Sequence, residues 1–229
     1  MIPRFSLVLT ASREDAALAT AIAPSANVMV YPNSIPRVER PARQAKYLIG
    51  FSGNFEYHPN IDAVKFLTRE IWPKIRKMHP EIELRLIGVG DKFIRHLIPA
   101  GSGIETTGPV EDALTEIASA SIVIAPLRTG SGTRIKILEG WAAARPVIAT
   151  PLAAEGLMAE DDHDIVLAGT AGEFASAVDR LLSDAAERER IGGNGRQTYE
   201  RNYTWEAAWR TLDLNPQLML PKELNRYTG

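Results

Sequence analysis

Residues 118–152, ASASIVIAPLRTGSGTRIKILEGWAAARPVIATPL, decide the fold. A short apolar run over 121–126 leads into a glycine-punctuated loop, a helical segment and a second apolar run over 146–150. Strand, loop, helix and strand within about 30 residues are typical of a parallel βαβ unit. The stretch therefore predicts a parallel sheet with helices on its faces.

The loop over 128–136, RTGSGTRIK, has the composition of an anion-binding site. Its glycines let the backbone approach a ligand closely, and the following helix directs free N–H groups toward the loop. The loop also carries three cations, Arg128, Arg134 and Lys136. An ordinary loop with Ser131 or Thr133 as the helix cap is the alternative, but a cap needs no such charge. The loop does not match a P-loop, because the glycine spacing before the lysine is absent.

Composition excludes several classes of protein. The chain has 229 residues, 45% of them apolar, which gives room for one large or two small domains with a sizeable core. The net charge of −2 does not favour nucleic acid or an anionic membrane. The chain has no cysteine, and its four histidines have no paired spacing, so we expect neither thiolate chemistry nor a metal site. No apolar run approaches a membrane span or a signal peptide, and we expect a cytoplasmic protein.

Strand-like and helix-like segments alternate along nearly the whole chain. We expect strands over 5–10, 27–31, 47–52, 83–88, 103–107, 121–126, 146–150 and 164–168. We expect helices over 13–23, 60–78, a short stretch up to 98, 111–119, 171–183, 184–202 with a break at Gly192-Gly193, and a turn over 205–210. Such alternation predicts an α/β fold with a doubly wound parallel sheet.

The chain also divides into parts. Prolines and unpatterned polar residues over 33–45 predict a linker, and residues 213–229 have little periodicity. Residues 1–32 form a single βαβ unit, which cannot bury both faces of its own sheet. We therefore expect this unit to belong to a larger domain.

Glycine-rich loops at 50–53, 88–90, 108 and 130–132 all follow expected strands, so they should meet at one edge of the sheet. The Gly88-Val89-Gly90 turn lacks the third glycine of a dinucleotide fingerprint, and a plain tight turn explains it equally well. For the Gly192–Gly195 cluster a helix C-cap explains the sequence better than a phosphate loop.

Two further residues have alternative interpretations. His58 follows the strand over 47–52, where it is either a solvated loop residue or a ligand contact. Glu139 lies one turn beyond Lys136, where it is either a surface carboxylate that pairs with Arg134 or Lys136, or an acceptor for vicinal hydroxyls.

Several ordered phrases together resemble the group 1 (family 4) retaining glycosyltransferases of the two-domain GT-B type. They are FSGN at 51–54, PNIDA at 59–63, LIGVG at 86–90, GPV at 108–110, APLR through GSGTRIKILE at 125–139 and RPVIAT at 145–150. The resemblance covers residues 5 to about 210. It implies the C-terminal half of a GT-B fold, a Rossmann-like domain over 46–212 that binds the nucleotide-sugar. Residues 1–32 would then be a remnant of the N-terminal acceptor domain, with the first part of that domain missing.

The resemblance also implies roles for single residues. Glu139 matches the second glutamate of the family's E-x7-E motif, which holds the ribose hydroxyls, and the first glutamate, which contacts the donor sugar, falls on Ser131. These two positions are the candidates for the catalytic centre. The family's arginine and lysine after the first core strand, which neutralise the diphosphate, fall on Asn54 and Asn60. We expect nearby cations of the 128–136 loop to replace them. The full set expected to bind the donor is Gly53, Asn54, His58, Asn60, Gly88, Arg128, Gly130, Gly132, Thr133, Arg134, Ile135 and Lys136.

The activity that the resemblance implies is transfer of a sugar from a nucleoside diphosphate sugar to a glycan or lipid-linked glycan, with retention of configuration. It implies no cofactor and no divalent metal, and by analogy a place in polysaccharide synthesis at the inner face of the membrane. Two alternatives stay open. One is a binding module that cannot transfer because the acceptor domain is missing, and the other is a sugar-nucleotide epimerase. A homodimer or a separate N-terminal half could complete the cleft.

Overall fold

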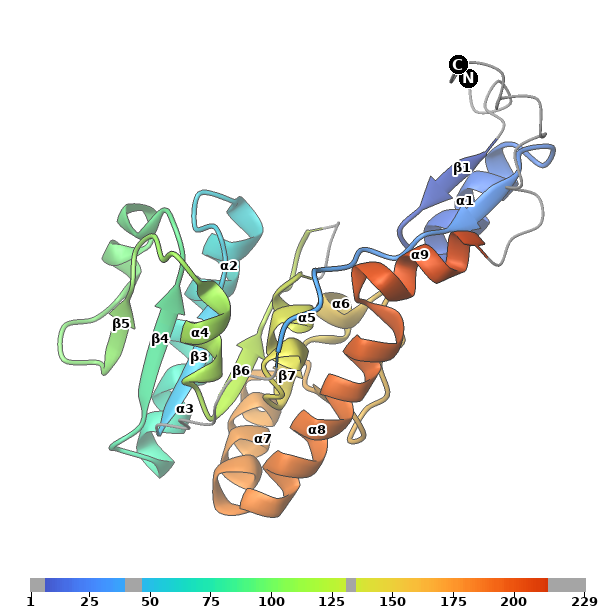
Figure 1. Cartoon of the computed structure of the whole chain (residues 1–229). Helices are drawn as coiled ribbons and strands as arrows, with labels where there is room; N and C mark the ends of the chain where they lie inside the picture. The colour runs from blue at the N-terminus through green and yellow to red at the C-terminus, as the bar shows by residue number, and fades with distance from the viewer. Residues whose placement is uncertain (1–6, 40–46, 131–134, 214–229) are drawn as a thin grey trace.

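The computed structural model describes residues 7–39, 47–130 and 135–213 (Figure 1). Its main sheet has six parallel strands in the order β5-β4-β3-β6-β7-β8. The strands are β3 (Leu48–Ser52), β4 (Glu83–Ile87), β5 (Ile104–Thr106), β6 (Ile122–Ala125), β7 (Val147–Ala149) and β8 (Val166–Leu167). The order reverses direction beside β3, where β6 pairs on the side opposite β4. This is the strand order of a doubly wound Rossmann-like sheet, and it confirms the predicted fold class.

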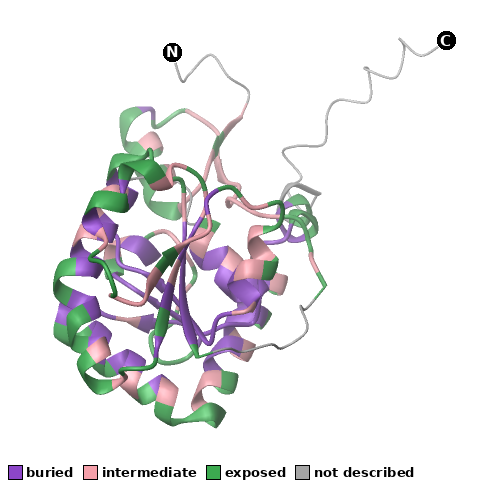
Figure 2. Cartoon of the chain, turned by 90° about the vertical axis from the view of Figure 1, so that its left-hand side faces the viewer, coloured by how far each residue is buried: buried purple, intermediate pink, exposed green. Residues whose placement is uncertain are grey.

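Helices cover both faces of this sheet (Figures 1 and 2). One face is covered by α2 (His58–Phe66), a π-helical segment (Leu67–Ile71), α3 (Trp72–Met78) and α7 (Ala171–Ser183), and the other by α4 (Ala113–Ala118), α5 (Ile135–Ala142) and α8 (Ala185–Asn202). Every residue of β3, β6 and β7 is buried, as expected of parallel strands between two helical layers. The ends of the strands therefore provide the accessible part of the central sheet.

A small second unit stands apart from the main domain, at the upper right of Figure 1. It consists of β1 (Val8–Thr10), α1 (Arg13–Ile22) and β2 (Val28–Val30), with the two strands parallel. Ser12 caps α1 by accepting a hydrogen bond from the Asp15 amide, and no residue of α1 is buried. The predicted βαβ unit is thus confirmed, and its helix α1 has no buried residue.

The segment between the two units has no regular structure, but its described residues are fixed to the C-terminal helices. Ile35 forms a bridge with Thr204, and the Tyr199 hydroxyl donates to the Pro36 carbonyl at 2.6 Å. The Arg196 guanidinium, which is buried, donates to the Val38 carbonyl at 2.6 Å. The helix α9 (Trp205–Asp213) continues from this contact toward the small unit (Figure 1).

Three local features differ from the prediction. The expected helix over 60–78 is longer and begins at His58, and a π-helical turn divides it into α2 and α3. The stretch up to residue 98 forms two 3-10 turns instead of one helix. A four-residue helix, α6 (Pro151–Ala154), follows β7 and was not predicted. Thr150 caps α6 and proline begins it, and both signals were present in the sequence.

The predicted helix end at the Gly192–Gly195 cluster is wrong, because α8 continues through it to Asn202. A Cβ on Gly192 would lie 2.5 Å from the Ala144 carbonyl oxygen, and one on Gly195 would lie 2.3 Å from Trp141 Cδ1. These glycines therefore let α8 pack directly on α5 and on the turn that follows α5. Gly193 faces open space and has no such role.

We predict opposite effects of alanine at two neighbouring glycines of α8. Gly195→Ala should lower the free energy of unfolding by about 1–3 kcal/mol, because the new methyl group overlaps the buried Trp141 ring. Gly193→Ala is the matched control and should raise stability by about 0.5–1 kcal/mol, because alanine is the better helix former. Urea denaturation of both variants tests the pair, and equal effects would contradict the packing argument.

Candidate functional site

The carboxyl ends of β3 and β4 are held together by backbone contacts. The Gly53 amide donates to the Ile87 carbonyl at 2.9 Å, and the Phe55 amide donates to the Val89 carbonyl at 2.9 Å. Gly88 has a φ of +130°, and a Cβ there would lie 2.2 Å from the Gly53 carbonyl oxygen. Glycine is thus required at position 88 for the two strand ends to approach each other.

The loop after β6 joins the same edge. Gly130 has a φ of +107°, and a Cβ there would lie 3.0 Å from the Pro59 side chain at the start of α2. The loops after β3, β4 and β6 therefore meet, as the glycine pattern predicted. The helix α5 begins at Ile135 beside them, so its N-terminal end belongs to the same edge.

The side chain of Glu139 lies within this edge and is mostly covered. Its Oε2 accepts a hydrogen bond of 2.9 Å from the Ser52 hydroxyl at the end of β3. Burial raises the pKa of the Glu139 carboxyl, while the Ser52 hydrogen bond and the charge of Lys136 act in the opposite direction. Glu139 is therefore not a fully exposed surface carboxylate, because α5 turns this half-buried side chain toward the sheet. Its pairing with Arg134 or Lys136 and its role as an acceptor for vicinal hydroxyls both stay predictions.

We predict that the Glu139 carboxylate lowers the free energy of unfolding at neutral pH. A carboxyl whose pKa is raised by folding stabilises the native state when protonated and loses that contribution as the pH rises above the unfolded value. At pH 7 the free energy of unfolding of Glu139→Gln should therefore be equal to that of the wild type or up to about 1 kcal/mol higher. Urea denaturation at several pH values from 4 to 8 should show the difference growing with pH. The prediction is contradicted if the stability of the glutamine variant, measured relative to wild type, is lower at pH 7 than at pH 4.

Asn54 and Asn60 brace the loop between β3 and α2. Asn54 Oδ1 accepts from the Glu56 amide at 2.9 Å, and Asn60 Nδ2 donates to the Asn54 carbonyl at 2.7 Å. Asn60 is 5% exposed and lies against Gly53. Its Oδ1 is buried and has no hydrogen-bond partner among the described residues. Both side chains thus have a structural explanation, and their predicted contact with the donor stays a prediction.

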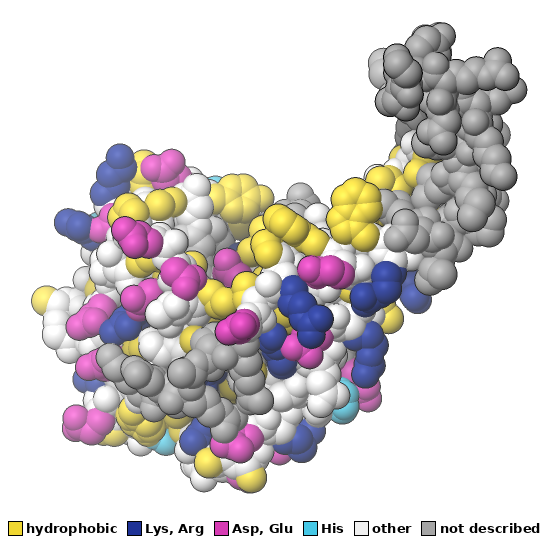
Figure 3. All heavy atoms as spheres, viewed as in Figure 1, with side chains coloured by type: hydrophobic (Ala, Val, Ile, Leu, Met, Phe, Trp, Pro, Cys, Tyr) yellow, Lys and Arg dark blue, Asp and Glu magenta, His cyan; other side chains and the backbone are white. Residues whose placement is uncertain are grey.

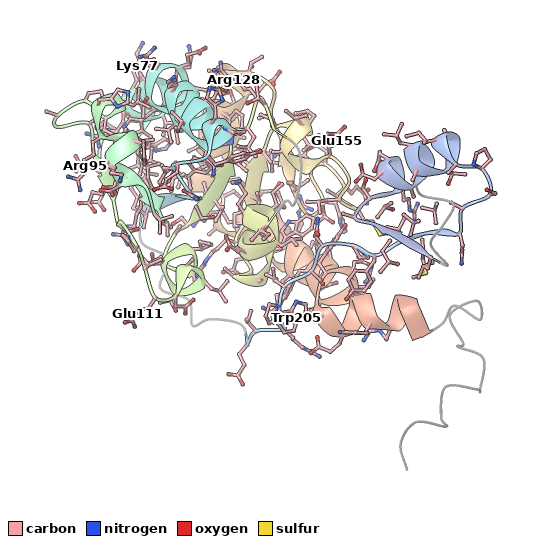
Figure 4. All side chains as sticks on the ribbon, turned by 90° about the horizontal axis from the view of Figure 1, so that it is seen from above. Lys77, Arg95, Glu111, Arg128, Glu155 and Trp205 are labelled. Carbon is pink, nitrogen blue, oxygen red and sulfur yellow. The ribbon has the colours of Figure 1, made fainter. Side chains whose placement is uncertain are left out.

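Arg128 is engaged on the outer side of the loop, next to α2 (Figure 4). Its guanidinium donates to both carboxylate oxygens of Asp62 at 2.8 and 3.2 Å and lies 4.6 Å from the centre of the Phe66 ring. This ion pair lowers the pKa of Asp62 and raises that of Arg128. The contacts do not support the predicted phosphate role of Arg128, because the pair with Asp62 would have to break first.

The other predicted residues are divided by what the structure describes. His58 is the exposed first residue of α2, and Ile135 is the exposed first residue of α5. Lys136 is half-buried, close enough to Glu139 to affect its pKa. The predictions on Ser131, Gly132, Thr133 and Arg134 concern positions outside the described residues. Among the described residues, no three histidine or acidic side chains form a group that could hold a metal ion.

Ser52 and Asp62 were not among the predicted site residues. Both lie within the quoted phrases FSGN and PNIDA, but their partners Glu139 and Arg128 lie 87 and 66 positions away. A serine at the end of an apolar strand that leads into a glycine loop was the available signal for Ser52.

A hollow of about 180 Å³ lies between the small N-terminal unit and the main domain. Its lining includes Ser12, Glu14, Leu138, Glu155 and Tyr203. Figure 4 shows Glu155 on the side of the main domain that faces the small unit. Since Leu138 precedes Glu139 in α5, this hollow adjoins the helix that carries the buried carboxylate. Acidic and basic side chains are mixed on the face that Figure 3 shows, without a large basic area.

The fold and the site define a Rossmann-like protein whose ligand edge combines glycine loops, a helix N-terminus and a half-buried carboxylate. The family model of glycosyl transferases group 1 matches residues 46–184. The chain therefore belongs to the group 1 glycosyltransferases, as the resemblance predicted. A curated relative, an exopolysaccharide phosphotransferase of Streptomyces coelicolor, is 30% identical over 116 residues, which are 47% of this chain and 12% of the relative.

Solved structures of glycosyltransferases share the fold. TarM of S. aureus, in complex with UDP and α-GlcNAc-glycerol, has a TM-score of 0.75 and 14% identity over 92% of this chain and 43% of TarM. HepE of Anabaena, in complex with UDP and glucose, has a TM-score of 0.71 and 14% identity over 92% of this chain and 63% of HepE. This chain thus spans about half the length of these proteins. In its described part, no helix is long and apolar enough to cross a bilayer.

Proposed function

We propose that the chain is the donor-binding half of a glycosyltransferase that moves a sugar from a nucleoside diphosphate sugar to a glycan or lipid-linked glycan, with retention of configuration. The observation that carries this proposal is the half-buried Glu139 carboxylate, hydrogen-bonded to Ser52, beside the N-terminal end of α5. A carboxylate there can accept hydrogen bonds from the vicinal hydroxyls of a ribose. Family membership and the UDP complexes of TarM and HepE support the same reading.

The diphosphate would lie at the N-terminal end of α5. Free amides and the helix dipole favour an anion there, and Lys136 adds a positive charge in the first turn. The same groups would stabilise the nucleoside diphosphate as it leaves the sugar. In this proposal the donor's leaving-group charge is offset by the protein without a divalent metal, and no protein nucleophile takes part.

The first test is a calorimetric screen of the chain against UDP, GDP, ADP and TDP, with magnesium and with a chelator. We expect micromolar binding of one diphosphate with the same affinity in both conditions. Glu139→Ala should weaken that binding about tenfold or more, since a charge-assisted hydrogen-bond acceptor is lost. Binding that appears only with magnesium would contradict the metal-free site, and the absence of any binding would contradict the donor-binding role.

The contacts of Arg128 lead to a separate prediction. Arg128→Ala and Asp62→Asn should each cost about 0.5–1 kcal/mol of stability and should be non-additive, as for a partly exposed ion pair. Denaturation of the two single variants and the double variant measures this coupling. The affinity of each single variant for the diphosphate should stay within about twofold of the wild-type affinity. If Arg128→Ala weakens diphosphate binding tenfold while Asp62→Asn strengthens it, Arg128 serves the phosphates and the prediction made from the sequence holds.

The alternative is a module that binds the nucleotide-sugar without transfer. The chain spans 43% of TarM and 63% of HepE, so transfer by a whole protein belongs to the proposal. Incubation with the nucleotide-sugar whose base binds, followed by product analysis, separates the possibilities. Glycoside formed on an added acceptor indicates transfer, an epimerised nucleotide-sugar indicates an epimerase, and unchanged donor indicates a binding module.

A further inference from the structure

Ser52 is a polar residue at the end of an otherwise apolar buried strand. The strand β3 reads LIGFS, and all five of its residues are buried. Ser52 itself is 4% exposed, and its hydroxyl donates to Glu139 Oε2. The hydrogen bond thus connects the central strand of the sheet to the helix whose N-terminus lies at the ligand edge.

The backbone around Ser52 is fixed on both sides. Ser52 pairs with Ile87 of β4, and Gly50, two residues earlier on the same strand, pairs with Val123 of β6. The Gly53 amide that follows is bonded to the Ile87 carbonyl. The Ser52 hydroxyl therefore has little freedom to move, and it defines where one oxygen of the Glu139 carboxylate must lie.

The second carboxylate oxygen of Glu139, Oε1, is the one that is not bonded to Ser52. A carboxylate offers about four lone-pair positions, and Ser52 uses one of those on Oε2. Among the described residues, no other hydrogen bond reaches the Glu139 carboxylate. With Oε2 anchored, Oε1 is presented in one orientation at the ligand edge.

A contribution to stability does not explain the hydrogen-bonded pair of Ser52 and Glu139. The burial that raises the pKa of Glu139 is only partly offset by Ser52, so the ionised carboxylate stays unfavourable in the folded chain. A buried polar pair is often replaceable by apolar residues without loss of stability. A requirement at the ligand edge explains why a carboxylate is nevertheless kept there.

We propose that Ser52 is a positioning residue for Glu139, whose hydroxyl orients the carboxylate so that Oε1 accepts from both hydroxyls of a nucleoside ribose. This inference rests on the proposed function for the role of Glu139. It assigns to the end of β3 a part in recognising ribose in the donor, in addition to the backbone contacts of the glycine loops.

The test compares Ser52→Ala with wild type by calorimetry, using the nucleoside diphosphate that binds and its 2′,3′-dideoxy analogue. Ser52→Ala should weaken binding of the ribonucleotide about tenfold and change binding of the dideoxy analogue less than about twofold. Ser52→Thr, which keeps the hydroxyl, should restore most of the ribonucleotide affinity. Equal weakening of both ligands would mean a general structural effect and would overturn the positioning role.

Two controls separate this inference from the proposed function. Ser121→Ala removes another buried serine, next to the start of β6 at the opposite end of the sheet, and should leave both affinities unchanged. If wild type binds the ribonucleotide and Ser52→Ala binds it equally well, only the positioning role is overturned. If wild type binds none of the four diphosphates, the proposed function fails and the role of Ser52 fails with it.

Discussion

The parallel sheet is buried on both faces, and this constraint determines where the protein can meet a ligand. Parallel strands need helices between them, and those helices cover the faces. The strand ends are left accessible, and at the carboxyl ends of β3, β4 and β6 the chain turns back in glycine-containing loops. The contact between Gly88 and the Gly53 carbonyl brings two of these ends together, and Gly130 against Pro59 brings in the third. The ligand edge is thus a consequence of the way the core is built.

Within that edge, the surrounding side chains hold one another in place. The two asparagines brace the loop after β3, and Arg128 ties the loop after β6 to α2 through Asp62. The polar groups that a diphosphate could have used are therefore partly committed to holding the loops. The N-terminal end of α5 lies at the same edge, and the proposed function places the diphosphate there.

The sequence predicted the parts of the structure that depend on local pattern. The helix over 171–183 was predicted with the bounds that α7 has, and in the structure Thr170 and Glu173 form a capping box at its start. The doubly wound sheet followed from the alternation of strands and helices. Features that depend on contacts between distant residues were not predicted. The cluster at Gly192–Gly195 looked like a helix end because local propensity says so, yet close packing on Trp141 requires glycine inside the helix.

The site was predictable to a similar extent. The position of Glu139 in the motif gave its role in the family, but the sequence did not indicate that the carboxylate is buried or that Ser52 holds it. The sequence likewise predicted that Arg128 is cationic and near the loop, without indicating that Asp62 neutralises it. Residue type and spacing along the chain define which groups reach an edge. Which of them stay available there depends on partners that are far away in the sequence.

The burial of Glu139 connects stability to function. A carboxylate with a raised pKa is a cost to the folded chain that glutamine at the same position would reduce. Glutamine, however, would offer a vicinal diol fewer and weaker acceptor positions than a carboxylate, because an N–H group replaces one of the two oxygens and the negative charge is lost. In the proposed function this unfavourable charge lies where a vicinal diol would bind. Proteins commonly deviate from optimal packing at functional sites, and in this chain the deviation lies between the end of β3 and the first turns of α5.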